Sequence, residues 1–252
     1  MADLSEIVEF LDGWLGVHET EDYPGAYNGL EVESRSPVEK VAAAVDACRA
    51  TAEMAGEADA ELLVVHHGLF WGDPLPLTGR NYRRVKAFLD RDLALYAAHL
   101  PLDAHPEVGN NVLLAGQLGL EVEGRFGDHD GVEGLGVWCA ADLPRERFLA
   151  RVRDACGAEP RLVAGGPPHV RRVGIVTGGA SDLIPQAREA GLDTFLTGEG
   201  PHHTFHLADE LGLNLVYAGH YATETFGVKA VARRLSGSFG LEWTFLDHPT
   251  GL

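Results

Sequence analysis

The sequence predicts an α/β fold made of two related α/β units, with mixed, mainly parallel sheets flanked by helices. Two observations carry this prediction. Short apolar runs rich in β-forming residues, such as 61–65, alternate with segments of helical periodicity, a pattern typical of parallel sheets. The same succession of strand, turn, helix and second strand also occurs twice, over 41–66 and over 173–198.

Each expected element follows from a local pattern. Leu4, Ile7, Leu11 and Leu15 recur at helical spacing, so a helix opens the chain. Further helices are expected at 48–55, 81–90, 110–118, 148–156, 183–190 and 224–235. Strands are expected at 41–46, 61–65, 93–98, 173–177, 194–197 and 215–218. Glycines and charges cluster between 124 and 136, which marks a candidate boundary.

The repeat extends to polar residues. The stretch YAAH that ends at His99 is echoed by YAGH, which ends at His220. Each of these histidines is followed four positions later by a carboxylate, Asp103 in the first half and Glu224 in the second. Two matches in the same order indicate a duplicated α/β unit.

Composition limits the class of protein. The 252 residues, 45% of them hydrophobic, suffice for one or two domains with a sizeable core. No apolar run approaches the roughly 18 residues that span a bilayer, and no secretory signal is visible before the first helix. The three cysteines form no CxxC pair, which argues against a disulfide framework or cysteine-bound zinc and favours a cytoplasmic location.

The balance of charge excludes some partners. The chain has 20 basic and 38 acidic residues, which gives a formal net charge of -18. Such a surface repels nucleic-acid phosphates and anionic membranes, so neither is expected as a partner. The 12 histidines are concentrated in a few groups along the chain.

Four predicted strand ends carry potential metal ligands, and sites in open α/β sheets form at such ends. They are His66 with His67, His99 with Asp103, Glu199 with His202 and His203, and His220 with Glu224. Imidazoles and carboxylates without thiolates suit zinc, manganese or iron. A histidine pair alone is more often structural, and Asp103 could simply cap a turn. The coincidence of four such ends favours a metal site.

Two metal ions fit this pattern better than one. His66 and His67 are neighbours just past a strand, so their side chains are expected to diverge and each would hold its own ion. His220 and Glu224 lie on one face of a helix start, where the carboxylate can bridge two ions, as can Asp103. Two divalent ions about 3.5–4 Å apart would hold and activate a bridging water as the nucleophile.

The sequence also resembles a known family, the Nif-three-like dinuclear metal-centre proteins, some of which are named GTP cyclohydrolase I type 2 homologues. The resemblance runs over essentially the whole chain. The chain is similar to the short bacterial branch of the family. Its carriers are the stretches 27–32 (YNGLEV), 65–71 (VHHGLFW), 99–106 (HLPLDAHP), 197–199 (TGE) and 219–224 (GHYATE). Relatives often have an acidic or small residue before Asn28, where this chain has Tyr27, which leaves the role of Asn28 open.

The resemblance implies intertwined repeats, the first at 1–126 and completed by 215–252, the second at 127–214. It further implies a homo-oligomer in the form of a hexameric toroid, with two divalent metal ions per chain. The implied metal ligands are His66, His67, Asp103, His220 and Glu224. His99 would bind a metal or orient one of its ligands, and Glu199 would accept a proton or anchor a ligand. In a hydrolase, Glu199 or His99 would be the catalytic residue that manages the proton.

Two functions remain open. The first is a metal-dependent hydrolase acting on a small nucleotide-like or phosphorylated substrate, with GTP cyclohydrolase type 2 chemistry implied by the resemblance alone. The alternative is a non-catalytic metal-binding or regulatory ring that binds a partner protein. The residues that could contact a substrate also have purely structural explanations. Arg80, Arg83 and Arg84 could bind a phosphate or begin a solvated helix. Phe70 and Trp71 could stack on a purine or pack in the core. No role is assigned to His202, His203 or His206.

Overall fold

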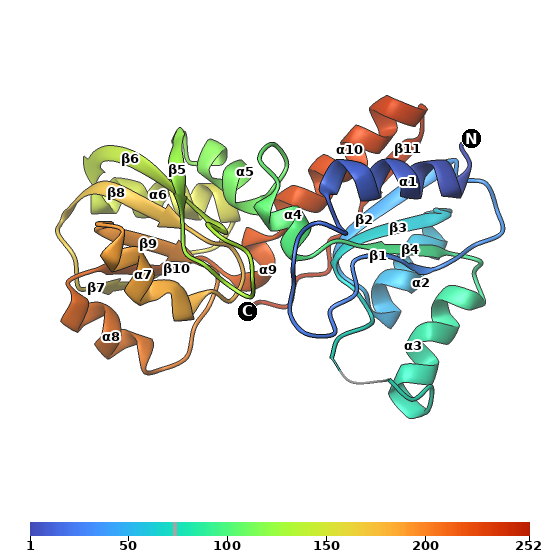
Figure 1. Cartoon of the computed structure of the whole chain (residues 1–252), viewed down its shortest axis with the longest axis horizontal. Coiled ribbons are helices and arrows are strands. Elements are labelled where there is room, and N and C mark those ends of the chain that lie inside the picture. The colour runs from blue at the N-terminus through green and yellow to red at the C-terminus, as the bar shows by residue number, and fades with distance from the viewer. Residues whose placement is uncertain (73–74) are drawn as a thin grey trace. The chain divides into compact units, whose positions relative to one another are not determined.

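The chain folds into two α/β units, each built on its own mixed sheet with flanking helices (Figure 1). The computed structural model describes residues 1–72 and 75–252. Unit 1 consists of Met1–His105 and Gly227–His248, and unit 2 of Pro106–Phe226 and Pro249–Leu252. The α/β class predicted from the sequence is confirmed.

Unit 1 contains a sheet with the strand order β1-β4-β3-β2-β11. Its strands are β1 (Gly29–Val32), β2 (Lys40–Asp46), β3 (Leu62–His67), β4 (Ala94–Ala97) and β11 (Glu242–Phe245). Its helices are α1 (Leu4–Leu15), α2 (Arg49–Glu57), α3 (Gly79–Leu89), α4 (Leu100–Ala104) and most of α10 (Thr225–Phe239). All neighbouring strands in this order run parallel except β1, which is antiparallel to β4.

Both faces of the sheet in unit 1 are covered by helices. Ala42, Leu63 and Leu95 come from β2, β3 and β4 and pack in one apolar cluster with Phe88 of α3 and Ala52 of α2. Helices α1 and α10 cover the opposite face (Figure 1). The sheet is therefore buried from both sides, as the continuous apolar runs in its strands indicate.

Unit 2 contains a sheet with the strand order β5-β6-β8-β9-β10-β7. Its strands are β5 (Val122–Phe126), β6 (Gly136–Pro144), β7 (Arg161–Ala164), β8 (His169–Ile175), β9 (Thr194–Thr197) and β10 (Asn214–Tyr217). Its helices are α5 (Asn110–Gln117), α6 (Arg145–Cys156), η1 (Ser181–Leu183), α7 (Ile184–Glu189), α8 (Thr204–Leu211) and α9 (His220–Thr223). Strands β8, β9 and β10 are parallel, whereas β5, β6 and β7 form antiparallel pairs.

The two sheets share a common motif. Three parallel strands lie side by side in chain order, and an antiparallel strand pairs with the last of them: β2-β3-β4-β1 in unit 1 and β8-β9-β10-β7 in unit 2. The duplication predicted from the sequence is thus present in the topology. Strand β3 corresponds to β9, and β4 to β10, so equivalent strand ends carry the candidate ligands in both units.

Strand pairing assigns two further strands to unit 2. Strand β5 pairs with β6, and β10 pairs with β9 and β7, so both strands lie in that unit. Strand β5 has mostly exposed positions and gives a weak strand signal in the sequence. The glycine- and charge-rich stretch 124–136 is the connection between β5 and β6.

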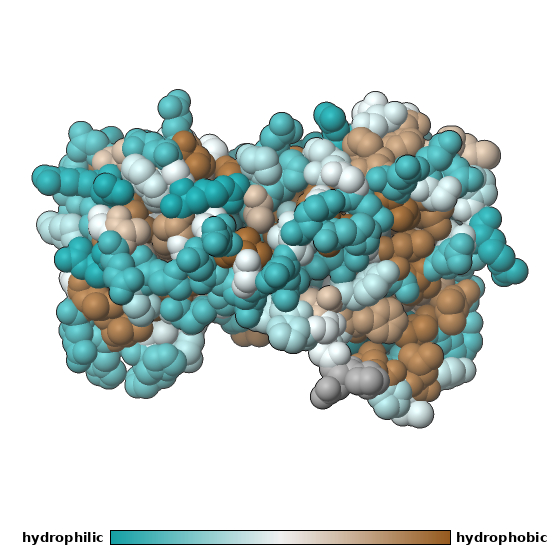
Figure 2. Space-filling view, in the orientation of Figure 1, coloured by the Kyte–Doolittle hydropathy of each residue, from teal (hydrophilic) through white to brown (hydrophobic). Residues whose placement is uncertain are grey.

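The surface combines hydrophilic and hydrophobic areas. Figure 2 shows hydrophilic residues interspersed with hydrophobic patches on the face in view. Among the residues that the structure describes, no helix combines the length and apolar character needed to cross a bilayer.

Candidate metal centre

Three histidines of unit 1 converge at the carboxyl ends of two neighbouring parallel strands. His66 and His67 are the last residues of β3, and His99 follows the end of β4. One ring nitrogen from each of the three lies within 4.8 Å of the others. Three imidazole nitrogens at this spacing could hold a divalent metal ion such as zinc, manganese or iron.

The rings of His66 and His67 do not diverge as the strand pleat alone predicts. Their centroids are 4.7 Å apart, and both rings also contact His99, at 4.9 and 5.5 Å. A separate hydrogen bond turns each ring. Nδ1 of His66 lies 3.0 Å from the carbonyl oxygen of Ala98, and Nδ1 of His67 lies 2.9 Å from Oδ1 of Asp46. These anchors override the alternation expected at a strand end.

The same contacts fix which nitrogen of each ring can bind a cation. Nδ1 of His99 lies 2.8 Å from Oδ1 of Asp22, so all three histidines face either a carbonyl or a carboxylate through Nδ1. Such oxygens only accept, so Nδ1 must carry the hydrogen and Nε2 the lone pair. Metal-binding histidines typically show this arrangement, in which the outer hydrogen bond sets the tautomer and orients the ring.

Asp22 is the centre of a buried network that positions His99. Its Oδ2 accepts hydrogen bonds from Nδ2 of Asn28, at 2.8 Å, and from the backbone N–H of Leu100, at 3.1 Å. Oδ1 of Asn28 in turn accepts from the backbone N–H of His99, at 2.7 Å. Asn28 therefore orients the Asp22 carboxylate and the start of the His99 segment. The sequence left the role of Asn28 open; in the structure it holds Asp22 and the backbone of His99 in place.

Burial and hydrogen bonding set opposite pKa shifts for this pair. Burial would raise the pKa of Asp22, but the hydrogen bonds from His99 and Asn28 outweigh it and hold the pKa below its ordinary value. Burial lowers the pKa of His99, which the contact with Asp22 only partly offsets. A neutral His99 that donates through Nδ1 is the form able to bind a metal ion through Nε2.

A second carboxylate holds the loop that follows His67. Glu31 on β1 accepts hydrogen bonds from the backbone N–H groups of Leu69 and Phe70, at 2.7 and 3.2 Å. Burial raises the pKa of Glu31 to about 7, against the opposing effect of these hydrogen bonds. A Cβ atom at Gly68 would lie 2.1 Å from Oε1 of Glu31, so a side chain there would displace this carboxylate. Both ends of the stretch 27–32 thus support the histidines.

Asp103 adds a carboxylate to the histidines of unit 1. It lies on α4, only 4% exposed, with Oδ2 3.5 Å from Nε2 of His66. Two ligand atoms of one tetrahedral zinc ion, each about 2.0–2.1 Å from it, lie roughly 3.3 Å apart. The spacing between these two atoms therefore fits a shared ion, and the interpretation of Asp103 as a turn cap is not needed.

Unit 2 carries a matching group at the carboxyl ends of β9 and β10. Oε2 of the buried Glu224 lies 3.2 Å from Nε2 of His220, and Oε1 of Glu199 lies 2.8 Å from Nδ1 of the same ring. His220 is therefore anchored through Nδ1 by an acceptor, as the histidines of unit 1 are. Burial opposes protonation, but the two carboxylates raise the pKa of His220 to about 9. This pKa favours a proton between Nε2 and Glu224, for which a metal ion would compete.

Glu199 also lines a recess on unit 2. The recess has a volume of about 340 Å³ and is bordered by Gly179, Ser181, Gly200 and Pro201 besides Glu199. The Glu199 side chain is about half exposed. The TGE segment is held by the backbone N–H groups of Gly198 and Glu199, which both donate to the carbonyl oxygen of Gly178. Glu199 can thus anchor His220 and still face solvent.

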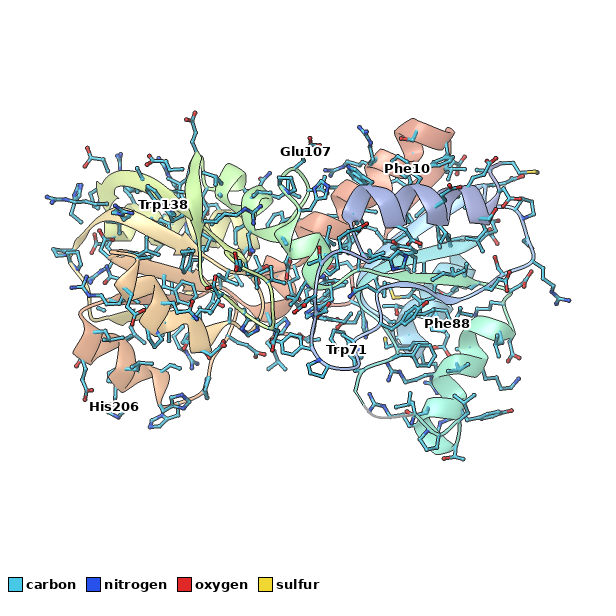
Figure 3. All side chains as sticks on the ribbon, in the orientation of Figure 1. Phe10, Trp71, Phe88, Glu107, Trp138 and His206 are labelled. Carbon is cyan, nitrogen blue, oxygen red and sulfur yellow. The ribbon has the colours of Figure 1, made fainter. Side chains whose placement is uncertain are left out.

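Other histidines noted in the sequence lie outside these groups. Nε2 of His105 lies 3.1 Å from the carbonyl oxygen of Trp14, and the two rings pack edge to face. His202, His203 and His206 lie exposed at the start of α8 (Figure 3 labels His206). A separate groove of about 740 Å³ lies along α1 and β1 in unit 1. None of the histidines discussed above lines it.

Sequence reasoning missed the anchoring carboxylates Asp22, Asp46 and Glu31. Asp46 ends β2, beside β3 in the sheet, so the strand-end rule that identified His66 could have identified it as well. Asp22 lies in the connection between α1 and β1, where no periodicity constrains it. Only the tertiary structure brings it to His99.

Comparisons with known proteins agree over the whole chain. Residues 2–250 match the family described as Duf34/NIF3 (NGG1p interacting factor 3). A protein of Deinococcus radiodurans named GTP cyclohydrolase 1 type 2 homolog is 46% identical, with 98% of this chain and 94% of that protein covered. A protein of Pseudomonas aeruginosa with the same name is 45% identical, with 98% and 97% covered.

Solved structures give the same result. The chain is similar to a structure described as "protein ybgI, unknown function", with a TM-score of 0.92, 36% identity and complete coverage of both chains. It is also similar to TTHA1606 from Thermus thermophilus, with a TM-score of 0.87, 44% identity and coverage of 99% and 100%. The chain therefore belongs to the Duf34/NIF3 family.

Proposed function

We propose that the protein is a dinuclear-metal-dependent hydrolase acting on a small nucleotide-like or phosphorylated substrate. The proposed ligands are His66, His67 and Asp103 of unit 1 with His220 and Glu224 of unit 2. The observation that carries the proposal is that four histidines, three in one unit and one in the other, are each anchored through Nδ1 by an acceptor. Nitrogen and oxygen donors of this kind suit zinc, manganese or iron.

The course of the chain supports a centre shared by the two units. Asp103 lies two residues before the chain leaves unit 1, and Glu224 lies two residues before it returns there. Successive Cα atoms are about 3.8 Å apart, so the Cα atom of each acid lies within roughly 8 Å of the last residue of its unit. The residues at the ends of β3 and β4 and those at the ends of β9 and β10 occupy equivalent positions in the duplicated motif, which also supports one centre built from both groups. Glu224 or Asp103 would be the bridging carboxylate.

Each residue has a distinct part in the proposed reaction. Two bound divalent ions would lower the pKa of a bridging water and orient a substrate oxygen. Asp22 and Asp46 hold His99 and His67 in their ligand tautomers. His99, whose Nε2 belongs to the group of three, would act as a further ligand. Glu199 would accept the proton that the water releases, because its half-exposed carboxylate already reaches His220.

A hydrolysis screen with a Glu199→Gln variant tests the proposal. Metal-loaded protein is offered nucleotides, GTP included, and phosphoesters, with a chelated sample as the blank. The variant is expected to retain its metals, because the glutamine oxygen still accepts from Nδ1 of His220, and to lose about 10²–10⁴-fold in turnover with the general base. Glu210→Gln, which changes an exposed carboxylate on α8, serves as the matched control and should behave as wild type.

The screen also separates the two functions. Chelator-sensitive turnover that falls in the Glu199 variant supports the hydrolase. A metal-loaded protein that turns over no compound would contradict it and favour a non-catalytic metal-binding ring. The oligomer, expected to be a hexamer on the strength of the family resemblance, is measured by light scattering on the same sample.

Asp22→Asn tests the anchoring of His99. An asparagine amide would point its NH2 donor either at the N–H groups of Leu100 and Asn28 or at Nδ1 of His99, so the network around His99 cannot stay intact. Loss of an anchor of this kind typically lowers metal affinity about 10- to 100-fold, which a competitive chelator titration measures. Glu21→Gln, an exposed neighbour, is the control. Equal affinity in the Asp22 and Glu21 variants would rule out the anchoring role.

A further inference from the structure

Two loops of unit 1 are fastened together beside the three histidines. One loop, residues 21–28, joins α1 to β1, and the other, residues 68–72, follows β3. The backbone N–H of Tyr27 donates to the carbonyl oxygen of Phe70, at 3.2 Å, and that of Gly72 donates to the carbonyl oxygen of Gly25, at 3.0 Å. Gly25 has φ of +82°, and a Cβ atom there would lie 2.4 Å from Gly72. The close approach of the loops therefore requires glycine.

The neighbours Phe70 and Trp71 have different environments. Phe70 packs against the apolar cluster beneath the sheet, together with Val85 of α3. Trp71 does not enter this core: it is 36% exposed, and its Nε1 donates to the carbonyl oxygen of Gly68, at 3.0 Å. Figure 3 shows Trp71 on the loops at the rim of unit 1, apart from Phe88 in the core. Partial burial against the core accounts for Phe70, whereas the indole of Trp71 stays at the surface.

Trp71 lies directly against the candidate metal ligands. Its ring centroid is 4.8 Å from that of His99, at an interplanar angle of 79°, and 5.9 Å from that of His67, at 56°. Neither imidazole stacks in parallel on the indole. Tyr23, 37% exposed, contacts the same His99 ring at 5.5 Å. Two exposed aromatic side chains, Trp71 and Tyr23, thus lie against the histidines.

We propose that Trp71, with Tyr23, forms a platform that stacks on a planar aromatic heterocycle of the substrate. The proposal rests on the hydrolase function proposed above and narrows its substrate class to compounds with such a ring, for example purine nucleotides. An indole already fixed by its Nε1 hydrogen bond loses little freedom when a ring stacks on it. Sugar phosphates and inorganic polyphosphates offer no aromatic face and would gain nothing from the platform.

Calorimetric titration of the metal-loaded protein tests the platform. The probes are GTP and ATP, with inorganic tripolyphosphate and ribose 5-phosphate as ligands without an aromatic ring. Trp71→Leu is expected to weaken nucleotide binding about 5- to 150-fold, the range seen when a base loses its stacking partner, and to leave tripolyphosphate binding unchanged. Trp71→Phe retains a ring and should recover most of the affinity. Phe205→Leu, at an exposed aromatic residue on α8, is the control.

The outcomes distinguish this inference from the hydrolase proposal. Equal GTP binding by wild type and Trp71→Leu, or GTP binding no tighter than that of tripolyphosphate, would overturn the platform. Chelator-sensitive hydrolysis of a non-aromatic phosphoester would then still support the hydrolase. Metal content is measured in every variant, and a loss of metal in Trp71→Leu that matches its loss of nucleotide binding would also overturn the stacking role, because Trp71 would then support the ligands instead.

Discussion

Replacing His67 with alanine is expected to leave a folded protein that lacks at least one of its metal ions. The change removes the Nε2 ligand atom but little of the core, because the His67 side chain is 21% exposed at the end of β3. In chelator-treated samples, wild type and variant should therefore unfold at similar temperatures. On addition of zinc or manganese, only wild type should gain its full stabilisation, because a ligand that binds the native state stabilises it by mass action.

The metal content of the same samples gives the decisive number. Elemental analysis after dialysis should show a lower ratio of metal to protein for His67→Ala than for wild type. His206→Ala, at an exposed histidine on α8 outside the candidate centre, should leave that ratio unchanged. Full occupancy in the His67 variant, or an equal loss in the His206 variant, would remove His67 from the ligand set.

Replacing Glu224 with glutamine is expected to abolish metal binding at the proposed dinuclear centre and all turnover. Glutamine has nearly the same shape, and Glu224 is only 3% exposed, so the packing around it should persist. A neutral amide, however, offers one weak oxygen in place of the charged carboxylate proposed to bridge two ions. Elemental analysis and the hydrolysis screen measure both losses, with Glu189→Gln on α7 as an exposed control.

The same variant has a readout that needs no metal. In the chelated protein, the carboxylates of Glu224 and Glu199 favour the charged imidazole and raise the pKa of His220 to about 9. Loss of the Glu224 charge removes part of this stabilisation, so the pKa of His220 should fall, as ring-proton NMR titration can show. A fall in this pKa with undiminished metal content would keep the contact but exclude Glu224 as a ligand.

The central part of each sheet could be predicted from the sequence because its strands are buried on both faces. Strands such as β3 are continuous apolar runs between turn signals, and α1 begins and ends at the residues that its periodicity indicates. Edge strands gave no such signal. Both β1 and β7 have four residues of mixed burial, and β11 is largely half-exposed, so their places follow only from pairing.

The candidate ligand residues stand out in the sequence because they follow strand ends, where α/β proteins form their sites. Their orientation could not. The sequence suggests that His66 and His67 diverge, whereas hydrogen bonds to Ala98 and Asp46 turn both rings toward His99. Ala98 and Asp46 are distant from the two histidines in the sequence. Only folding brings them together, so no periodic pattern in the sequence indicates these hydrogen bonds.

Anomalous scattering from crystals of the protein purified without chelator tests the central claim most directly. We expect two peaks about 3.5–4 Å apart, touched by the histidine pair that ends β3 and by the acid of the GHYATE segment. A lone peak that only unit 1 contacts, or none in a protein whose elemental analysis shows no metal, would contradict a dinuclear centre built from both halves of the chain.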